Sequence, residues 1–418
     1  MNRRQFLKST FFTTLGAVVL SACKTVAVST KNIADKIGKV ATKKFKDLDI
    51  SAIGFGLMRL PQKNGEPDVS AVQQMVDYAM EHGINYYDTA WFYHSGKSEV
   101  TAGKVLKKYP RDSYYLADKL PLSRLTGKDS VLEFFNEQLN RCQVDYFDFY
   151  LAHCINESEW KTVKDYNIYE QLSQKKKEGK IKYLGFSIHD TPELLEEVIS
   201  TYKWDFVQLP INLIDWEKTD SSGWYGVNAK KQYEIATKAG IPVVVMNPLK
   251  GGQLSTLNST AVELLKKENP DVSPSSWSLR YVASLENVFC LLSGMTEMEH
   301  MIDNVNTFIN FKPLTEKEQK ILSNAIAVYK SSGAITCTYC KYCDGCPIGI
   351  DIPEIFSMYN KYKADGKKDI FISVYEKISP EKRADNCISC GLCKTKCPQK
   401  LDIPKLLKEV DSLYKSLK

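Results

Sequence analysis

Four ionisable residues, of types that transfer protons, follow short apolar stretches in the first half of the chain. They are Asp88, Tyr93, Lys119 and His153. Singly, such residues usually cap a strand or pack beside it, but three consecutive strands with ionisable groups at one end favour catalysis. A phenol beside an ammonium group loses its proton more easily, because the cation stabilises the phenolate. We therefore predict that Tyr93 donates a proton to a carbonyl oxygen. Asp88 would hold Lys119 charged, and His153 would orient the carbonyl.

These residues belong to a regular alternation of short apolar runs and amphipathic helical patterns, such as those over 69–81 and 132–141. The expected strands are 51–58, 84–88, 114–119, 148–153, 183–188, 206–211, 242–246 and 288–293. Eight alternating pairs predict an α/β fold, a (β/α)8 TIM barrel, rather than a doubly wound sheet. The Gly-x-Gly-x-x-Gly fingerprint of the doubly wound fold is absent from the sequence.

From Phe45 to Phe311 the chain resembles the aldo/keto reductase superfamily, whose Asp, Tyr, Lys and His tetrad corresponds to the four residues above. The resemblance implies a bound nicotinamide cofactor, NAD or NADP. Its carboxamide would contact Ser187 and Gln208, and the remaining cofactor contacts would be Asn247, Pro248, Leu249 and Gly251 at the pyrophosphate and Ser293, Gly294, Asp303 and Asn304 at the adenosine. Each polar residue alone is more often a satisfied turn or strand-end group; together, in register, they favour the cofactor.

The sequence departs from the family pattern at both ends of the expected cofactor site. Ile188 and His189 follow Ser187 where many members of the family carry Asn. Where the family commonly has a basic pair for the 2′-phosphate of NADP, this chain has Gly294, Met295 and His300. Arg and Lys are the usual phosphate partners, so the choice between NAD and NADP stays open.

Eight of the 12 cysteines lie in two closely spaced runs near the C-terminus. The first run is Cys337, Cys340, Cys343 and Cys346, and the second is Cys387, Cys390, Cys393 and Cys397. Each run ends in Cys-Pro, and the second matches the spacing of bacterial ferredoxins, which bind [4Fe-4S] clusters. Structural zinc is the competing interpretation, and disulfides are a third. We predict two [4Fe-4S] clusters.

The two runs also form an internal repeat, because Cys-Pro-x-x-x-Asp-Ile-Pro follows in both, over 346–353 and 397–404. The likeness to ferredoxins implies that the fourth cysteine of each run crosses over to the other cluster. Cluster one would then use Cys337, Cys340, Cys343 and Cys397, and cluster two would use Cys387, Cys390, Cys393 and Cys346. The first run has two residues, not three, before its fourth cysteine.

The N-terminus has the pattern of an export signal. Arg3 and Arg4 precede Phe-Leu-Lys, as in twin-arginine signals, and the apolar stretch 11–20 is too short to span a bilayer. Leu-Ser-Ala before Cys23 resembles a bacterial lipobox. An ordinary signal cleavage site is the alternative. We predict a periplasmic protein, anchored to a membrane through lipid on Cys23. Twin-arginine export carries folded proteins, which allows cluster assembly in the cytosol first.

The predicted organisation is a signal peptide over 1–23, a Lys-rich flexible tether over 24–44, the barrel over 45–313, and a linking helix with a small helical ferredoxin-like domain over 314–418. Residues 1–46 hold ten Lys or Arg and one acid, so the remainder is slightly acidic and nucleic-acid binding is not expected.

This organisation predicts an exported oxidoreductase that interconverts a carbonyl and an alcohol on a small molecule. The C-terminal clusters would carry electrons and could serve a redox partner protein. The alternative is an electron-transfer module on a catalytically inactive barrel. Outside the cytoplasm no soluble NAD(P)H pool is expected, so the nucleotide would stay bound or be recycled through the clusters.

Overall fold

The computed structural model describes residues 36–217, 228–397 and 399–418. The expected signal peptide, with Arg3, Arg4 and Cys23, lies outside these ranges. Within them, the structure contains no helix with the length and apolar character that a membrane crossing requires.

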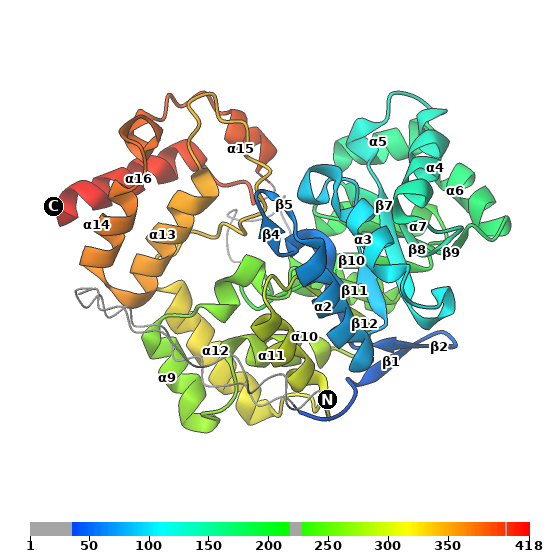
Figure 1. The fold of residues 1–418 in the computed structure, drawn as a ribbon, viewed down its shortest axis with the longest axis horizontal. Coiled ribbons are helices and arrows are strands. Elements are labelled where there is room, and N and C mark those ends of the chain that lie inside the picture. Colours follow the sequence, from blue (N-terminus) through cyan, green and yellow to red (C-terminus); the bar gives the residue numbers. More distant parts are fainter. Residues whose placement is uncertain (1–35, 218–227, 398) are drawn as a thin grey trace, which may run out of the picture. The chain divides into compact units, whose positions relative to one another are not determined.

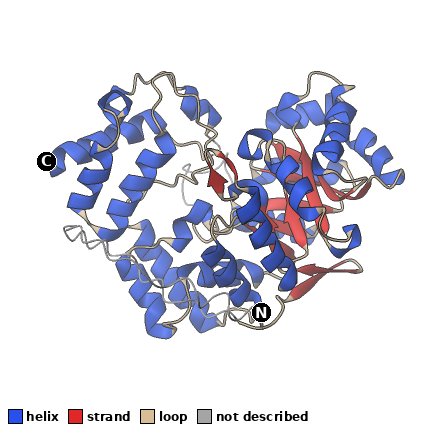
Figure 2. Ribbon diagram, viewed as in Figure 1, coloured by secondary structure: helices blue, strands red, loops and turns tan. Residues whose placement is uncertain are grey.

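Eight parallel strands close into a barrel, in the spatial order β10, β11, β12, β3, β6, β7, β8, β9 (Figure 2). Their bounds are β3 Ile53–Gly56, β6 Tyr86–Asp88, β7 Tyr115–Leu120, β8 Phe147–Ile155, β9 Ile181–Ile188, β10 Phe206–Pro210, β11 Val243–Met246 and β12 Val288–Ser293. Each overlaps one of the eight expected strands, so the predicted TIM barrel is confirmed. Because all strands are parallel, their carboxyl ends meet at one rim.

The helices that follow the barrel strands along the chain cover the outside of the barrel (Figure 1). Their bounds are α2 Val69–Glu81, α3 Ser98–Leu106, α4 Ser130–Cys142, α5 Glu157–Asp165, α6 Ile168–Lys177, α7 Pro192–Thr201, α8 Ala229–Lys238, α9 Ser259–Glu268, α10 Pro274–Ala283, α11 Met298–Phe308 and α12 Glu316–Lys330. Side chains at the N-caps fix several starts. Asp68 accepts hydrogen bonds from the backbone of Ser70 and Ala71 at the start of α2.

The chain joins the barrel earlier than predicted. The backbone N–H of Lys36 donates to Asn306 at 3.0 Å, and the hairpin of β1 (Thr42–Phe45) and β2 (Leu48–Ser51) precedes the first barrel strand. Phe45 is buried against aromatic rings inside the barrel, among them Phe149 and Phe289, whose centroids lie 5.3 Å and 4.4 Å away. The expected flexible tether is therefore wrong for residues 36–44, because burial of Phe45 and backbone pairing hold this segment in place.

The C-terminal part consists of helices around a separate apolar core. They are α13 Ile352–Asp365, α14 Lys368–Glu376, α15 Leu392–Lys396 and α16 Ile403–Leu417. The repeated Asp-Ile-Pro of the sequence starts α13 and α16, since proline fits the first helical turn. Asp351 caps α13 by accepting from the backbone of Glu354, whereas Asp402 pairs with Lys394 at 3.0 Å.

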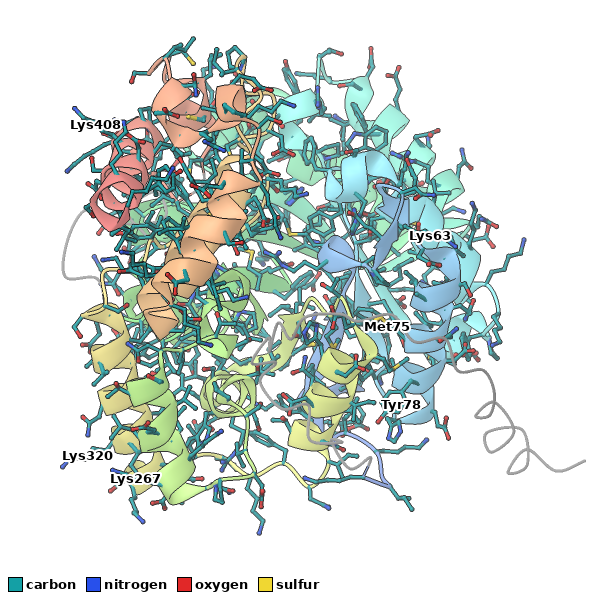
Figure 3. All side chains as sticks on the ribbon, turned by 60° about the vertical axis from the view of Figure 1, so that its left-hand side comes forward. Lys63, Met75, Tyr78, Lys267, Lys320 and Lys408 are labelled. Carbon is teal, nitrogen blue, oxygen red and sulfur yellow. The ribbon has the colours of Figure 1, made fainter. Side chains whose placement is uncertain are left out.

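The helix that was expected to link the two parts, α12, packs against α9 in a cluster of its own, which includes Leu322, Ile326 and Trp277. It is thus part of the barrel body. Surface helices are amphipathic, with lysines such as Lys267, Lys320 and Lys408 reaching outward (Figure 3).

Candidate active site

The structure brings the four expected proton-transfer residues together at the carboxyl rim of the barrel. Asp88 ends β6, Lys119 lies in β7 and His153 in β8, while Tyr93 follows β6 in a short 3-10 helix, Tyr93–Gly96. The Lys119 ammonium donates to Asp88 Oδ1 at 2.6 Å and to the Thr89 carbonyl at 2.6 Å. It lies 3.4 Å from the Tyr93 hydroxyl oxygen. Lys119 is fully buried, so the Asp88 carboxylate compensates a charge that water cannot reach.

His153 lies beside Tyr93, with the two rings edge to face and their centroids 6.3 Å apart. Burial, with a smaller contribution from the nearby Lys119 charge, lowers the pKa of His153 to about 3. The imidazole is therefore neutral at physiological pH. Its Nδ1 is buried and has no hydrogen-bond partner among the described residues. A neutral imidazole can donate to a carbonyl oxygen, which is the role expected of His153.

The expected lowering of the Tyr93 pKa is wrong for the structure as it stands. Burial, reinforced by the Asp88 charge, raises the pKa of Tyr93 well above its usual value, and the Arg59 guanidinium opposes the increase. Sequence reasoning weighed the Lys119 charge and missed the cost of ionising a phenol that is only 9% exposed. Tyr93 consequently carries its proton at neutral pH, which a proton donor requires.

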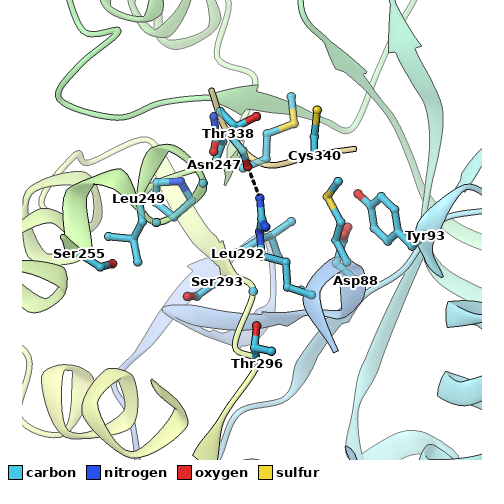
Figure 4. Close-up of a pocket in the computed structure, with 18 of the residues that line it drawn as sticks. Asp88, Tyr93, Asn247, Leu249, Ser255, Leu292, Ser293, Thr296, Thr338 and Cys340 are labelled. Atoms are coloured by element: carbon cyan, nitrogen blue, oxygen red, sulfur yellow. Dashed lines mark hydrogen bonds between the residues drawn. The ribbon is translucent and has the colours of Figure 1, made fainter. Parts of the chain in front are cut away.

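A cavity of about 430 Å³ opens at this rim (Figure 4). Asp88, Tyr93 and His153 line it. All the residues expected to contact the nicotinamide cofactor line it too, namely Ser187, Gln208, Asn247, Pro248, Leu249, Gly251, Ser293, Gly294, Asp303 and Asn304. The volume lies within the usual range for small-molecule sites.

Buried polar atoms in this cavity fit a nicotinamide nucleotide. Gln208 Oε1 and Asn247 Nδ2 are buried without a hydrogen-bond partner among the described residues, and such atoms are costly unless a ligand pairs with them. A carboxamide supplies the N–H donors that Gln208 Oε1 needs. Ser187 Oγ accepts from the Cys154 backbone at 2.7 Å and keeps its own proton for a ligand. Ser187 and Gln208 would therefore hold the nicotinamide part, and Asn247 Nδ2 would donate to an acceptor elsewhere on the nucleotide.

The glycine-containing turn that was expected to contact the pyrophosphate contacts the C-terminal part of the chain. Gly251 has φ +67°, and a Cβ built there would lie 2.3 Å from the Thr338 carbonyl oxygen. The close backbone approach that requires glycine is thus made by the C-terminal part of the chain. Lys250 turns away from the cavity to Asp215, at 2.7 Å, and to Gln399 Oε1, also at 2.7 Å. Gln253 donates to the Cys337 carbonyl at 2.7 Å.

The cysteines of the expected cluster one gather around one small cavity. Cys337, Cys340, Cys343 and Cys397 line it, together with apolar residues such as Phe356 and Ile403. This is the set that the ferredoxin resemblance implied, with Cys397 coming from the second run. Thiolates in an apolar shell suit an iron–sulfur cluster. These four cysteines would hold the cluster, and the cluster would supply one-electron chemistry.

The cysteines of the expected cluster two lie on a more open segment. Cys387 and Cys393 are half-buried and Cys390 is exposed. Cys346, also half-buried, packs at the edge of the same C-terminal core. No three His, Cys, Asp or Glu side chains in the described ranges are grouped as ligands of a single metal ion.

The sequence did not predict that residues from the first cysteine run also line the cavity of the proton-transfer residues. Thr338 and Cys340 line the same cavity as Asp88 and Tyr93 (Figure 4). Arg59, which follows β3, also lines it and donates through Nη2 to the Thr338 carbonyl at 2.5 Å. A Cβ at Gly294 would lie 3.0 Å from the Arg59 side chain, so this glycine leaves room for the arginine. No local sequence signal connects Arg59 with residues almost three hundred positions away.

Comparison with known proteins agrees with this geometry. Residues 52–327 match the aldo/keto reductase family, and residues 335–402 match the 4Fe-4S dicluster domain. The chain belongs to the aldo/keto reductase family and is an oxidoreductase of this type, with a C-terminal 4Fe-4S domain. α12 falls largely within the reductase match, in keeping with its packing on α9.

One similar sequence and two solved structures cover the barrel. An uncharacterized oxidoreductase of Bacillus subtilis, YqkF, is 25% identical over 66% of this chain and 93% of its own length. The holo form of the aldo-keto reductase AKR11C1 from Bacillus halodurans is 23% identical, with a TM-score of 0.56 over 68% of this chain and 96% of its own. An aldo-keto reductase from Klebsiella pneumoniae in complex with NADPH is 19% identical, with a TM-score of 0.55 over 70% and 96%. These structures show the fold.

Proposed function

We propose that the protein interconverts a carbonyl and an alcohol on a small molecule, with a nicotinamide nucleotide in the 430 Å³ cavity and the 4Fe-4S domain as its electron relay. The observation that carries this proposal is the position of Cys340. This expected cluster ligand lines the same cavity as Asp88 and Tyr93. Two redox groups held by these residues would be neighbours, which favours electron exchange between them.

The residues of the chain have separate tasks in this reaction. The nicotinamide, when bound, supplies or accepts the hydride. Tyr93, protonated at neutral pH, donates its proton to the carbonyl oxygen. Lys119, 3.4 Å from the phenol oxygen, stabilises the negative charge that develops there, and Asp88 holds Lys119 in place. His153 donates to the carbonyl oxygen as a neutral group.

The electron count is consistent with two clusters. Oxidation of one alcohol group to a carbonyl releases two electrons and two protons. Each 4Fe-4S cluster accepts one electron, so one substrate molecule would reduce both clusters of one chain. In the opposite direction an external one-electron donor would deliver two electrons through the same clusters.

The test uses the visible absorbance of oxidised clusters in the purified, cluster-loaded protein. Substrate alcohols added without free nucleotide should bleach this absorbance. Cys397→Ser, which removes a cluster-one ligand that does not line the large cavity, should abolish the bleaching. Cys390→Ser, on the open segment, is the matched control and should leave about half of the amplitude. Absence of bleaching, together with steady carbonyl reduction by free NADH, would contradict the relay.

We also propose that the chain is exported and lipid-anchored in the periplasm. The paired residues Arg3 and Arg4 and the lipobox-like Cys23 support this. A nucleotide that leaves the cytoplasm inside the protein must remain bound, so the purified periplasmic protein should contain it. Cys23→Ala should release the protein from the membrane fraction. Replacing both arginines by lysine should keep it in the cytoplasm.

A further inference from the structure

Arg59 places a half-buried positive charge between the reductase cavity and the expected first cluster. It is the last residue of the short 3-10 helix Leu57–Arg59, which follows the carboxyl end of β3. Its side chain passes over Gly294, and its guanidinium donates to the Thr338 carbonyl at 2.5 Å. Thr338 lies between two expected cluster ligands, Cys337 and Cys340. The arginine thus clamps the ligand loop onto the barrel.

This charge has no carboxylate partner among the described residues. The two buried lysines nearby are compensated, Lys119 by Asp88 at 2.6 Å and Lys250 by Asp215 at 2.7 Å. Burial lowers the pKa of Arg59. A cation that loses part of its hydration without gaining an anion is destabilised. A negative charge close to Arg59 would therefore stabilise the guanidinium, and no carboxylate of the described residues provides it.

A thiolate-bound cluster is anionic and gains one more negative charge on reduction. A fixed positive charge beside it stabilises the reduced form and raises the reduction potential, because net charge and hydrogen bonds near the sulfurs set that potential. We propose that Arg59 is the counter-ion of cluster one and makes it the better electron acceptor of the two clusters. Near the expected second cluster, Lys394 is exposed and paired with Asp402. Arg383, four positions before Cys387, donates to the carbonyls of Ile378 and Glu376 and to none of the residues between the cysteines.

The inference goes beyond the proposed reaction, since it concerns a cluster potential and needs no substrate. The competing role for Arg59 is to bind an anionic group of the nucleotide, because it also lines the large cavity. The two roles predict different measurements. A counter-ion sets the cluster potential with the cavity empty, whereas a nucleotide ligand changes only nucleotide affinity.

The experiment is a redox titration of the full, cluster-loaded protein without substrate or nucleotide, followed by EPR of the reduced clusters. Arg59→Gln should shift one cluster to a lower potential and leave the other unchanged. Arg59→Lys, which keeps the charge, should stay close to wild type. Arg124→Gln is the matched control, because Arg124 lies 5.7 Å from the Phe92 ring and does not line either cavity. It should shift neither potential.

Three results would overturn the proposal. Unchanged potentials in Arg59→Gln, with weaker binding of NADH or NADPH, would make Arg59 a nucleotide ligand. Equal shifts of both clusters would indicate a general loosening of the domain. If Arg59→Gln fails to retain cluster one, the Arg59→Lys protein alone decides. A clear drop in the potential of cluster one in Arg59→Lys would refute a role for the charge. A wild-type potential there would support the role.

Discussion

Gly251 offers a direct test of how the two parts of the molecule are held together. Its φ is +67°, and a Cβ there would lie 2.3 Å from the Thr338 carbonyl oxygen. Gly240 has almost the same φ, +68°, but a Cβ there would have no atom within 4 Å, so it is the matched control. Both Gly→Ala changes force a residue into the left-handed region, at about 1–2 kcal/mol. Only the change at Gly251 adds a steric overlap, with the loop that carries Thr338 between Cys337 and Cys340.

The overlap should cost a further ~1–3 kcal/mol, as overpacking typically does. Moving the loop away relieves it but breaks the hydrogen bonds from Gln253 to Cys337 and from Arg59 to Thr338. The population with the loop undocked should therefore rise about 5-fold to 150-fold, since ~1.4 kcal/mol is a factor of ten. Cluster one would be exposed in that population, so iron should escape faster by a similar factor.

The assay follows iron release to a coloured ferrous chelator from the reduced, cluster-loaded protein. Gly251→Ala should release the iron of one cluster much faster than wild type, and Gly240→Ala should release it at the wild-type rate. Equal rates in all three proteins would show that the contact between Gly251 and Thr338 does not hold the loop. The attribution to docking would then fail, whatever the effect on overall stability.

Three further outcomes are expected. Tyr93→Phe should reduce carbonyl reduction by about 10²-fold to 10⁴-fold while the nucleotide still binds, measured by steady-state rates and cofactor fluorescence; equal activity would refute the role of the phenol. Iron analysis should find about eight irons per chain in wild type and about four in Cys390→Ser; zinc would contradict the cluster assignment. Burial lowers the pKa of His153 from 6.5 to about 3, so below pH ~6.5 the unfolded chain binds a proton that the folded chain does not. The protein therefore loses stability as the pH falls from ~6.5 towards 3. The free energy of unfolding should therefore drop by about 2 kcal/mol between pH 7 and 5, with a smaller drop in His153→Gln.

The barrel could be predicted from the sequence because each strand and helix has its own local pattern of apolar residues. Buried parallel strands are short apolar runs, and α2 occupies the residues that its periodicity predicts. The proton-transfer residues could be predicted for the same reason, since each lies near the carboxyl end of a strand of known direction. The N-terminal boundary of the barrel could not be predicted, because a Lys-rich segment has no local pattern that indicates a strand. Only the burial of Phe45 against distant rings orders this segment.

The electrostatics of the site also lay beyond the sequence. The pKa of Tyr93 depends on the degree of burial, and spacing along the chain does not report burial. Arg59 and Cys340 meet at one cavity although 281 positions separate them, a pairing that only the folded chain reveals. A pattern within one domain cannot predict which residues of another domain will complete its site.

Two glycines of the expected cofactor site show how such a position can serve a different neighbour. Gly251 and Gly294 occupy positions where the family resemblance implied close approach to a nucleotide. In the structure their open faces admit the Thr338 backbone and the Arg59 side chain. Both neighbours belong to the contact that joins the cavity to the loop of Cys337 and Cys340. These contacts therefore favour glycine at both positions whether or not the cofactor is bound. Because the clamp and the cavity share these residues, a change that loosens the domain should also alter the site where the carbonyl reacts.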